Sequence, residues 1–223
     1  MSTNTVERTF PVRERTAWVI VVIVWAGYLV LYLLGTSGAA HTVAKGLLMP
    51  ALLLWVLAAT APAAPRLLVA GLVLATVGDV GLRVEFLVGM AGFLVMQVLY
   101  VIGFVRLGAW PRVRSGWPVA LGYLVFAIVA NALLGPRLGE LQIPVLVYSI
   151  ALCTMAIFAA GVSGRVGLGG LLFLVSDMLI GVGEADLDFA GRGLIVLVTY
   201  LAAQYLIATG WVRVVRPDVT LPL

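Results

Sequence analysis

The stretch FLVGMAGFLVMQVLYVIGFV, residues 86–105, runs for twenty residues without a charged side chain. An α-helix needs about 20 predominantly apolar residues to cross the ~30 Å hydrocarbon core of a bilayer. A helix of a soluble domain would interrupt such a block with a polar face. The stretch therefore predicts a membrane-spanning helix.

Apolar blocks of the same kind occupy most of the chain on both sides of this stretch. The breaks between them contain Gly, Pro, Ser or charged residues, and the shortest, Arg83-Val84-Glu85, predicts a tight helical hairpin. No break is long enough to hold a soluble domain, so we expect residues 1–223 to form a single transmembrane domain. The eight predicted spans are residues 16–34, 43–60, 66–82, 86–106, 117–135, 141–162, 167–183 and 191–213.

The composition supports the same fold class. Hydrophobic residues make up 63% of the chain and charged residues only 11%, whereas soluble domains carry roughly 25% charged residues. Most of the surface must therefore face something other than water. We expect an all-α, polytopic transmembrane helix bundle, in a bacterial plasma membrane or a eukaryotic endomembrane.

The net charge of +4 does not indicate nucleic acid as a partner, because the basic residues are scattered between apolar blocks. Their distribution instead predicts orientation, since cytoplasmic segments carry an excess of Lys and Arg. With both termini in the cytoplasm, ten basic residues fall inside: Arg8, Arg13, Arg15, Arg66, Arg106, Arg112, Arg114, Arg165, Arg213 and Arg216. Four fall outside: Lys45, Arg83, Arg137 and Arg192.

The first block follows Arg13 and Arg15 and precedes the small residues Gly38-Ala39-Ala40, as a cleaved secretory signal would. It is longer than the ~7–15 apolar residues of a signal sequence. We therefore expect a retained first helix, with cleavage as the alternative.

The two halves of the chain carry similar markers in the same order. These are Pro50, Arg66, Asp79 and Gln97 in the first half, and Pro144, Arg165, Asp177 and Gln204 in the second. The Arg-to-Asp separations are 13 and 12 residues, but the Asp-to-Gln separations differ by nine. The pattern indicates either a parallel four-plus-four repeat or a chance match.

Asp79 and Asp177 are the two acids set within predicted spans. A charge at the bilayer centre costs about 2.5–3.5 kcal/mol on insertion scales, so such residues usually have a role. Counted at ~1.5 Å per residue from Arg66 and Arg165, both carboxyl groups fall at similar depth in the outer half of the bilayer. One alternative is a structural ion pair, for example of Asp79 with Arg83. The matching depth favours a functional pair.

Other polar side chains fall at compatible levels and predict a polar chamber that opens toward the outer leaflet. Each could equally form an interhelical hydrogen bond. They are Lys45, Gln97, Tyr100, Asn131, Tyr148, Ser149, Tyr200 and Gln204. His41 is the single histidine, and we expect it to be solvated in an outer loop. The chain has no GxSxG, HExxH or phosphate-loop motif and no His/Cys cluster for zinc.

The chain resembles the YhhN family of membrane proteins from about Lys45 to Gly210. The motifs on which the resemblance rests are Lys45-Gly-Leu-Leu-Met-Pro50, Gly78-Asp79, Gln97-Val-Leu-Tyr100, Pro144 with Tyr148, Ser176-Asp177, and Thr199-Tyr200 followed by Gln204. Characterised animal members of that family are lysoplasmalogenases. The resemblance implies hydrolysis of the sn-1 vinyl-ether bond of a lysoplasmalogen with an ethanolamine or choline head group. The products would be a fatty aldehyde and a glycerophospho-alcohol.

The chemistry of a vinyl ether suits these residue types. Protonation of the terminal alkene carbon leaves an oxocarbenium ion, which water then captures. Buried carboxyl groups tend to keep a proton near neutral pH, and two neighbouring ones tend to share it. We therefore expect Asp79 and Asp177 to be the catalytic pair, with no metal or cofactor. The expected substrate-binding residues are Lys45 (for the phosphate), Gln97, Tyr100, Asn131, Tyr148, Ser176, Tyr200 and Gln204. The substrate would be a lysophospholipid taken from the bilayer.

Two other functions fit the same residues. A proton-coupled transporter also needs intramembrane acids and is often built from repeats. It would require sealed vesicles, whereas a hydrolase would turn over in detergent. A lipid-binding scaffold would bind lipid without releasing aldehyde and would tolerate neutralisation of the acids.

Overall fold

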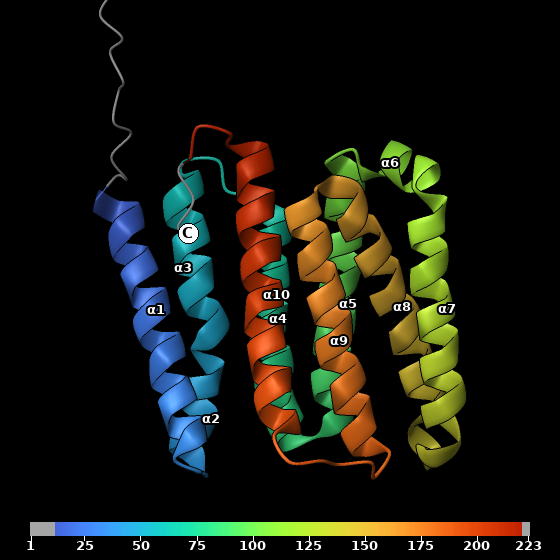
Figure 1. Cartoon of the computed structure of the whole chain (residues 1–223). Coiled ribbons are helices and arrows are strands. Elements are labelled where there is room, and N and C mark those ends of the chain that lie inside the picture. The colour runs from blue at the N-terminus through green and yellow to red at the C-terminus, as the bar shows by residue number, and fades with distance from the viewer. Residues whose placement is uncertain (1–11, 220–223) are drawn as a thin grey trace, which may run out of the picture.

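The computed structural model describes residues 12–219, and within them the chain is helical with no strand. Within residues 12–219, eight segments are long and apolar enough to cross a membrane, so the predicted all-α, eight-span bundle is confirmed. The helices stand side by side in one bundle (Figure 1). They are α1 (Val12–Leu33), α2 (Ala39–Gly46), α3 (Leu48–Thr60), α4 (Arg66–Val84), α5 (Phe86–Arg106), α6 (Ala109–Ser115), α7 (Trp117–Leu134), α8 (Gln142–Val162), α9 (Gly164–Glu184) and α10 (Arg192–Val215).

The centre of the bundle is built from two closely packed hairpins, α4–α5 and α9–α10, with α8 against both α5 and α9. α1 and α7 lie at the two edges (Figure 1). In α4–α5 the backbones meet at glycines: a Cβ on Gly81 would lie 2.7 Å from the Gly89 Cα, and one on Gly92 would lie 2.8 Å from the Gly78 nitrogen. Small residues permit such close approach between helices in a membrane. Asp79 lies between the two α4 glycines, so this seam fixes its position.

The two halves of the chain run through four spans each in the same order, and each ends in one of the two tight hairpins. This order is compatible with the predicted parallel repeat. The repeat itself stays a prediction.

The second span differs from its predicted form, residues 43–60. It begins four residues earlier and is divided at Leu47 into α2 and α3. The Leu47 N–H bonds to the Ala44 carbonyl at 3.3 Å, a tighter turn than that of an α-helix. Trp25 of α1 donates its indole N–H to the Leu48 carbonyl at 3.0 Å beside this break. The short α2 thus becomes a separate element that carries His41 and Lys45.

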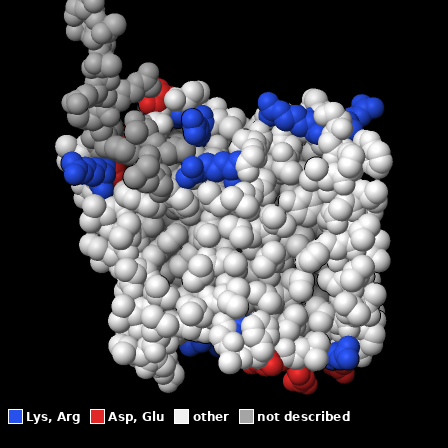
Figure 2. Space-filling view, viewed as in Figure 1, with Lys and Arg blue, Asp and Glu red and all other residues white. Residues whose placement is uncertain are grey.

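Basic residues concentrate at one end of the bundle, and a group of acidic residues lies at the other. Figure 2 shows most Lys and Arg side chains at the end where α1 begins and α10 ends, while acidic side chains gather at the opposite end. Nine of the ten basic residues predicted to be cytoplasmic lie among the described residues, and Arg8 lies outside them. The chain forms a multi-pass membrane bundle, and the cytoplasmic location of its termini stays a prediction.

Candidate active site

Asp79 of α4 and Asp177 of α9 line the same polar cavity. Its volume is about 200 Å³, well above the ~10–15 Å³ that a single water needs. Residues from α1, α2, α5 and α10 complete the wall. The polar groups that line it are Tyr28, Tyr32, His41, Lys45, Asp79, Arg83, Ser176, Asp177 and Tyr200. The structure thus brings together two acids that are 98 residues apart in the chain.

Both oxygens of the Asp79 carboxyl have partners. Oδ2 accepts a hydrogen bond from the Tyr200 hydroxyl at 2.8 Å, and Oδ1 lies 3.7 Å from the Lys45 ammonium. The Asp79 side chain is 3% exposed and that of Lys45 is 19% exposed. The ion pair suggested by sequence spacing, between Asp79 and Arg83, is not formed among residues 12–219. Lys45 takes that place because the short α2 packs directly against α4.

Aromatic rings hold Tyr200 in this position. The Phe93 ring meets it edge to face at 5.8 Å between centroids, and the Phe173 ring does so at 5.7 Å. Phe93 and Phe173 also contact each other at 6.1 Å. Edge-to-face aromatic pairs contribute roughly 0.5–1.5 kcal/mol each beyond the area they bury. The Tyr200 hydroxyl is therefore aimed at Asp79 by three helices, α5, α9 and α10.

Asp177 has a tyrosine partner of its own. The Tyr148 hydroxyl of α8 donates a short hydrogen bond to its Oδ2. Asp177 is half-buried, and no ion pair to it is formed within residues 12–219. The fully buried Gln97 of α5 lies beside the Tyr148 hydroxyl, although neither of its amide atoms meets the geometry of a hydrogen bond with the described residues.

Two of the predicted site residues, Tyr100 and Gln204, lie behind the cavity rather than in its wall. The Tyr100 hydroxyl donates to Gln204 Oε1 at 3.0 Å, and Gln204 Nε2 donates to the Met96 sulfur at 3.4 Å. Both residues are fully buried. This is the interhelical hydrogen bond that the sequence left open as an alternative. Gln204 also lies close to the Tyr200 hydroxyl, so it helps to position the Tyr200–Asp79 pair from behind the cavity.

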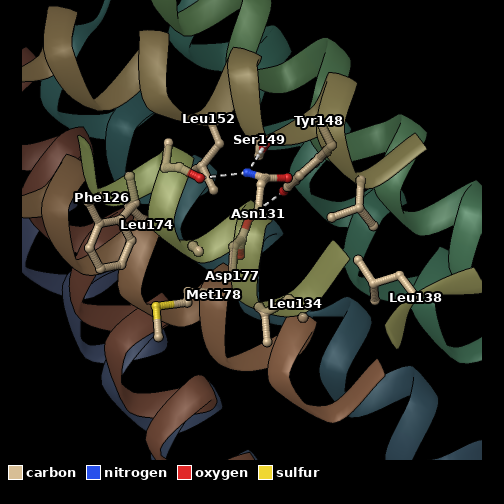
Figure 3. Close-up of a pocket in the computed structure, with 14 residues that line it drawn as sticks. Phe126, Asn131, Leu134, Leu138, Tyr148, Ser149, Leu152, Leu174, Asp177 and Met178 are labelled. Carbon is tan, nitrogen blue, oxygen red and sulfur yellow. Dashed lines mark hydrogen bonds between the residues drawn. The ribbon is translucent and has the colours of Figure 1, made fainter. Parts of the chain in front are cut away.

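The remaining predicted residues divide between two places. Ser176 is buried in the wall of the polar cavity and donates to the Val196 carbonyl at 3.1 Å. Asn131 and Ser149 lie instead in a second pocket, between α7, α8 and α9. There Asn131 Nδ2 donates to Ser149 Oγ at 2.9 Å and to the Ala127 carbonyl at 2.8 Å (Figure 3).

The expectation that His41 is solvated in an outer loop is wrong. His41 lies on α2, is 4% exposed and lines the polar cavity. Its Nε2 shares a hydrogen bond with the Tyr28 hydroxyl at 2.9 Å, and Nδ1 shares one with the Thr36 hydroxyl at 3.3 Å. Sequence reasoning missed Tyr28, Tyr32 and Arg83 as cavity residues as well. The available signal was the four-residue spacing from His41 to Lys45, which places both on one face of a helix.

The sequence model of the YhhN family matches residues 40–211, a region that contains both aspartates and both of their tyrosine partners. The chain belongs to the YhhN family. It is also similar to a human protein named "Lysoplasmalogenase TMEM86B", with 30% identity over 158 residues. That alignment covers 66% of this chain and 64% of the human protein, so the chain matches less than two thirds of its relative. No solved structure matches the chain.

Proposed function

We propose that this YhhN protein is an integral-membrane ether hydrolase that cleaves the sn-1 vinyl-ether bond of lysoplasmalogens. The products would be a fatty aldehyde and glycerophospho-ethanolamine or glycerophospho-choline. The observation that carries the proposal is the pair of tyrosine-bonded aspartates in one cavity of the bundle. The similarity to a protein named a lysoplasmalogenase supports the same reaction class.

The different surroundings of the two carboxyl groups suggest different roles. Lys45 lies 3.7 Å from Asp79, and a nearby cation favours the ionised form of a carboxyl group. Asp79 is thus suited to be the carboxylate. Asp177 accepts from Tyr148 on Oδ2, which leaves Oδ1 to carry a proton into the cavity. Asp177 is thus suited to be the acid.

In the first step, Asp177 gives its proton to the alkene carbon that is not bonded to oxygen. The C=C electron pair forms the new C–H bond, and the ether oxygen shares the positive charge left on its neighbouring carbon. The ionised Asp79 stabilises this oxocarbenium ion electrostatically. The Asp79 carboxylate lies close enough to both Lys45 and Asp177 for their charges to interact.

In the second step, water adds to the cationic carbon and gives a proton to one of the two carboxylates. The hemiacetal hydroxyl then loses its proton as the C=O bond of the aldehyde forms, and the bond to the glycerol oxygen breaks as that oxygen takes up a proton, so both carboxyl groups return to their starting protonation states. One water is consumed and the acid is restored. General acid–base catalysis of this kind contributes roughly 10²–10⁴-fold to rate.

Basic groups at the mouth of the cavity provide a place for the head-group phosphate. Lys45 was the predicted phosphate ligand, but its ammonium already lies beside Asp79. Arg83 is exposed, lines the same cavity and forms no ion pair within the described chain. A guanidinium binds phosphate in a bidentate manner. We therefore assign the phosphate to Arg83, with Lys45 nearby.

The test is aldehyde release from a synthetic lysoplasmalogen by purified protein in detergent. We expect activity from the wild type and its loss, by at least about 10²-fold, in both Asp79→Asn and Asp177→Asn. Asp188→Asn is the matched control, because Asp188 lies in the α9–α10 loop away from the cavity. Folded wild-type protein that releases no aldehyde would overturn the proposal.

A proton-coupled transporter is the second candidate, favoured by the Lys45–Asp79 ion pair inside a span. It predicts proton movement in sealed vesicles that Asp79→Asn abolishes, with no aldehyde in detergent. Aldehyde release by the wild type in detergent would decide for the hydrolase.

A further inference from the structure

We infer that the pocket between α7, α8 and α9 binds the hydrocarbon chain of the lipid, which enters from the bilayer beside α7. This inference rests on the proposed function, because it concerns the substrate of the same site. We refer to this site as the α7 pocket; its lining includes Phe126, Leu134, Leu152, Leu174, Asp177 and Met178.

Asp177 belongs to both the polar cavity and the α7 pocket. Figure 3 shows it grouped with Asn131, Tyr148 and Ser149, with apolar side chains around this group. The α7 pocket has a volume of about 70 Å³, and its wall contains no Lys, Arg, Asp or Glu other than Asp177. It therefore suits a chain of methylene groups and offers no cation for a phosphate.

The order of groups in a lysoplasmalogen matches the order of the two sites. The vinyl ether at sn-1 lies between the phosphate, on the other end of the glycerol, and the hydrocarbon chain. A phosphate at Arg83 in the polar cavity and a chain in the α7 pocket would place the vinyl ether between them. Asp177 lies at that junction, where the proton is needed.

The position of α7 provides a way in from the bilayer. No residue of α7 is buried, whereas α1, the helix at the other edge, buries Ala17, Val21 and Tyr28. Large apolar side chains such as Leu124 and Ile128 are 49% and 59% exposed on α7. Its contacts are mainly with α8, to which Asn131 is linked through Ser149. Displacing α7 therefore costs little buried area, because most of its surface is exposed in the isolated protein.

A smaller pocket also reaches Asp177, between the α4–α5 hairpin and α8–α9, and is lined by Phe86 and Met90. Its volume is about 40 Å³. We assign the chain to the α7 pocket because it is the larger of the two and because one of its walls is the loosely packed α7. Labelling can distinguish the two pockets.

The first experiment fills the α7 pocket without touching the polar cavity. Ala130 is half-buried in the pocket wall, and Ala132, two residues on, is exposed and outside it. We expect Ala130→Phe to lower kcat/KM for a long-chain lysoplasmalogen by at least about tenfold, the low end for a misfit in an apolar pocket. A short-chain analogue should be affected less than about twofold, and Ala132→Phe should match the wild type with both. Ala127→Phe, on the same wall, provides a second test should Ala130→Phe not fold.

The second experiment reads binding rather than turnover. A 1-O-alkyl lysophospholipid cannot undergo vinyl-ether hydrolysis, and a diazirine near the end of its chain would label the residues around it. We expect labelled peptides from α7 and α9, including the region of Phe126 and Met178, and weaker labelling in Ala130→Phe. Labelling at Phe86 and Met90, or equal labelling in Ala130→Phe and the wild type, would overturn the inference.

The two proposals fail separately. Labelling of the α7 pocket by a wild type that releases no aldehyde would overturn the hydrolase while supporting the chain site. Aldehyde release with equal chain-length dependence in Ala130→Phe and Ala132→Phe would support the hydrolase and overturn the chain site.

Discussion

Tyr200 donates its hydroxyl hydrogen bond to Asp79 across 121 residues of sequence, at 2.8 Å. Tyr148 makes the equivalent bond to Asp177 across 29 residues. Each aspartate of the site is thus held by a tyrosine from a different helix. In a membrane, where an unpaired polar group is costly, such a bond both positions and stabilises the carboxyl group.

Removal of either phenol should therefore weaken the site. We expect Tyr200→Phe and Tyr148→Phe each to lower kcat by at least about tenfold and to destabilise the protein by about 1–3 kcal/mol, the usual cost of leaving a buried acceptor unpaired. Tyr123→Phe, on the peripheral α7, is the control and should stay within about twofold of the wild type. Aldehyde release and thermal unfolding in detergent would measure both effects. Wild-type kcat in both variants would exclude the tyrosines from the mechanism.

The Lys45–Asp79 ion pair makes a prediction about stability. Removing one partner of a buried pair costs about 3–5 kcal/mol, whereas replacing both is often tolerated. The side chain of Lys45 is 19% exposed, so the low end of that range applies. We expect Lys45→Met to lower the Tm more than the double variant Lys45→Met with Asp79→Asn. A double-mutant cycle measures the coupling, and strictly additive effects would show that the pair contributes nothing.

Arg83 should act on substrate binding rather than on chemistry. We expect Arg83→Gln to raise KM at least about fivefold with kcat within about twofold, since a contact made equally to substrate and transition state affects KM alone. The effect should vanish with a 1-alkenyl glycerol, which has no phosphate. Arg137→Gln, a basic residue outside the cavity, is the matched control. Equal effects on the two substrates would contradict the assignment.

Substitution of Gln97 should affect stability and activity in opposite directions. A buried amide without hydrogen bonds costs about 1–3 kcal/mol, so Gln97→Met should leave the Tm unchanged or raise it. Because Gln97 lies beside the Tyr148 hydroxyl, we expect the same variant to lose activity. A variant that is at least as stable as the wild type and fully active would show that Gln97 does not take part in catalysis.

One pH effect concerns the α9–α10 loop. The Arg192 guanidinium lies 2.7 Å from Asp188 and, together with the Phe189 N–H, holds the pKa of that carboxyl below its ordinary 3.8. A lowered folded pKa means that the stabilisation is full above pH 3.8 and is lost as the pH falls through the folded value. Asp188→Asn should therefore lower the Tm slightly at pH 7 and not at all at a pH below the folded pKa. The Tm difference between wild type and variant at the two pH values measures this.

The sequence predicted the membrane spans well and the rotation of the helices about their axes poorly. The number of spans, the two aspartates and their shared cavity were all accessible, because hydrophobic length and the cost of buried charge act along the chain. Helices that are apolar on every side give no indication of which face points inward. For that reason Tyr100 and Gln204 were expected in the chamber but lie behind it, and Asn131 was expected there but lies in the α7 pocket. His41 was missed because its burial depends on the contact of α1 with α2, through Tyr28.

The glycine seam of α4 and α5 also determines where this chain can vary. A Cβ on Gly89 would lie 2.4 Å from the Leu82 nitrogen, and one on Gly78 would lie 2.7 Å from the Phe93 ring. The change at Gly89 would push the two backbones apart and displace Asp79, and the change at Gly78 would displace the Phe93 ring that packs against Tyr200. A mutagenesis library aimed at new lipid substrates should therefore leave these seam glycines unchanged. The pocket side of α7, which includes Ala127 and Ala130, is only half-buried, so this is where diversity can be introduced and where new specificities can be selected.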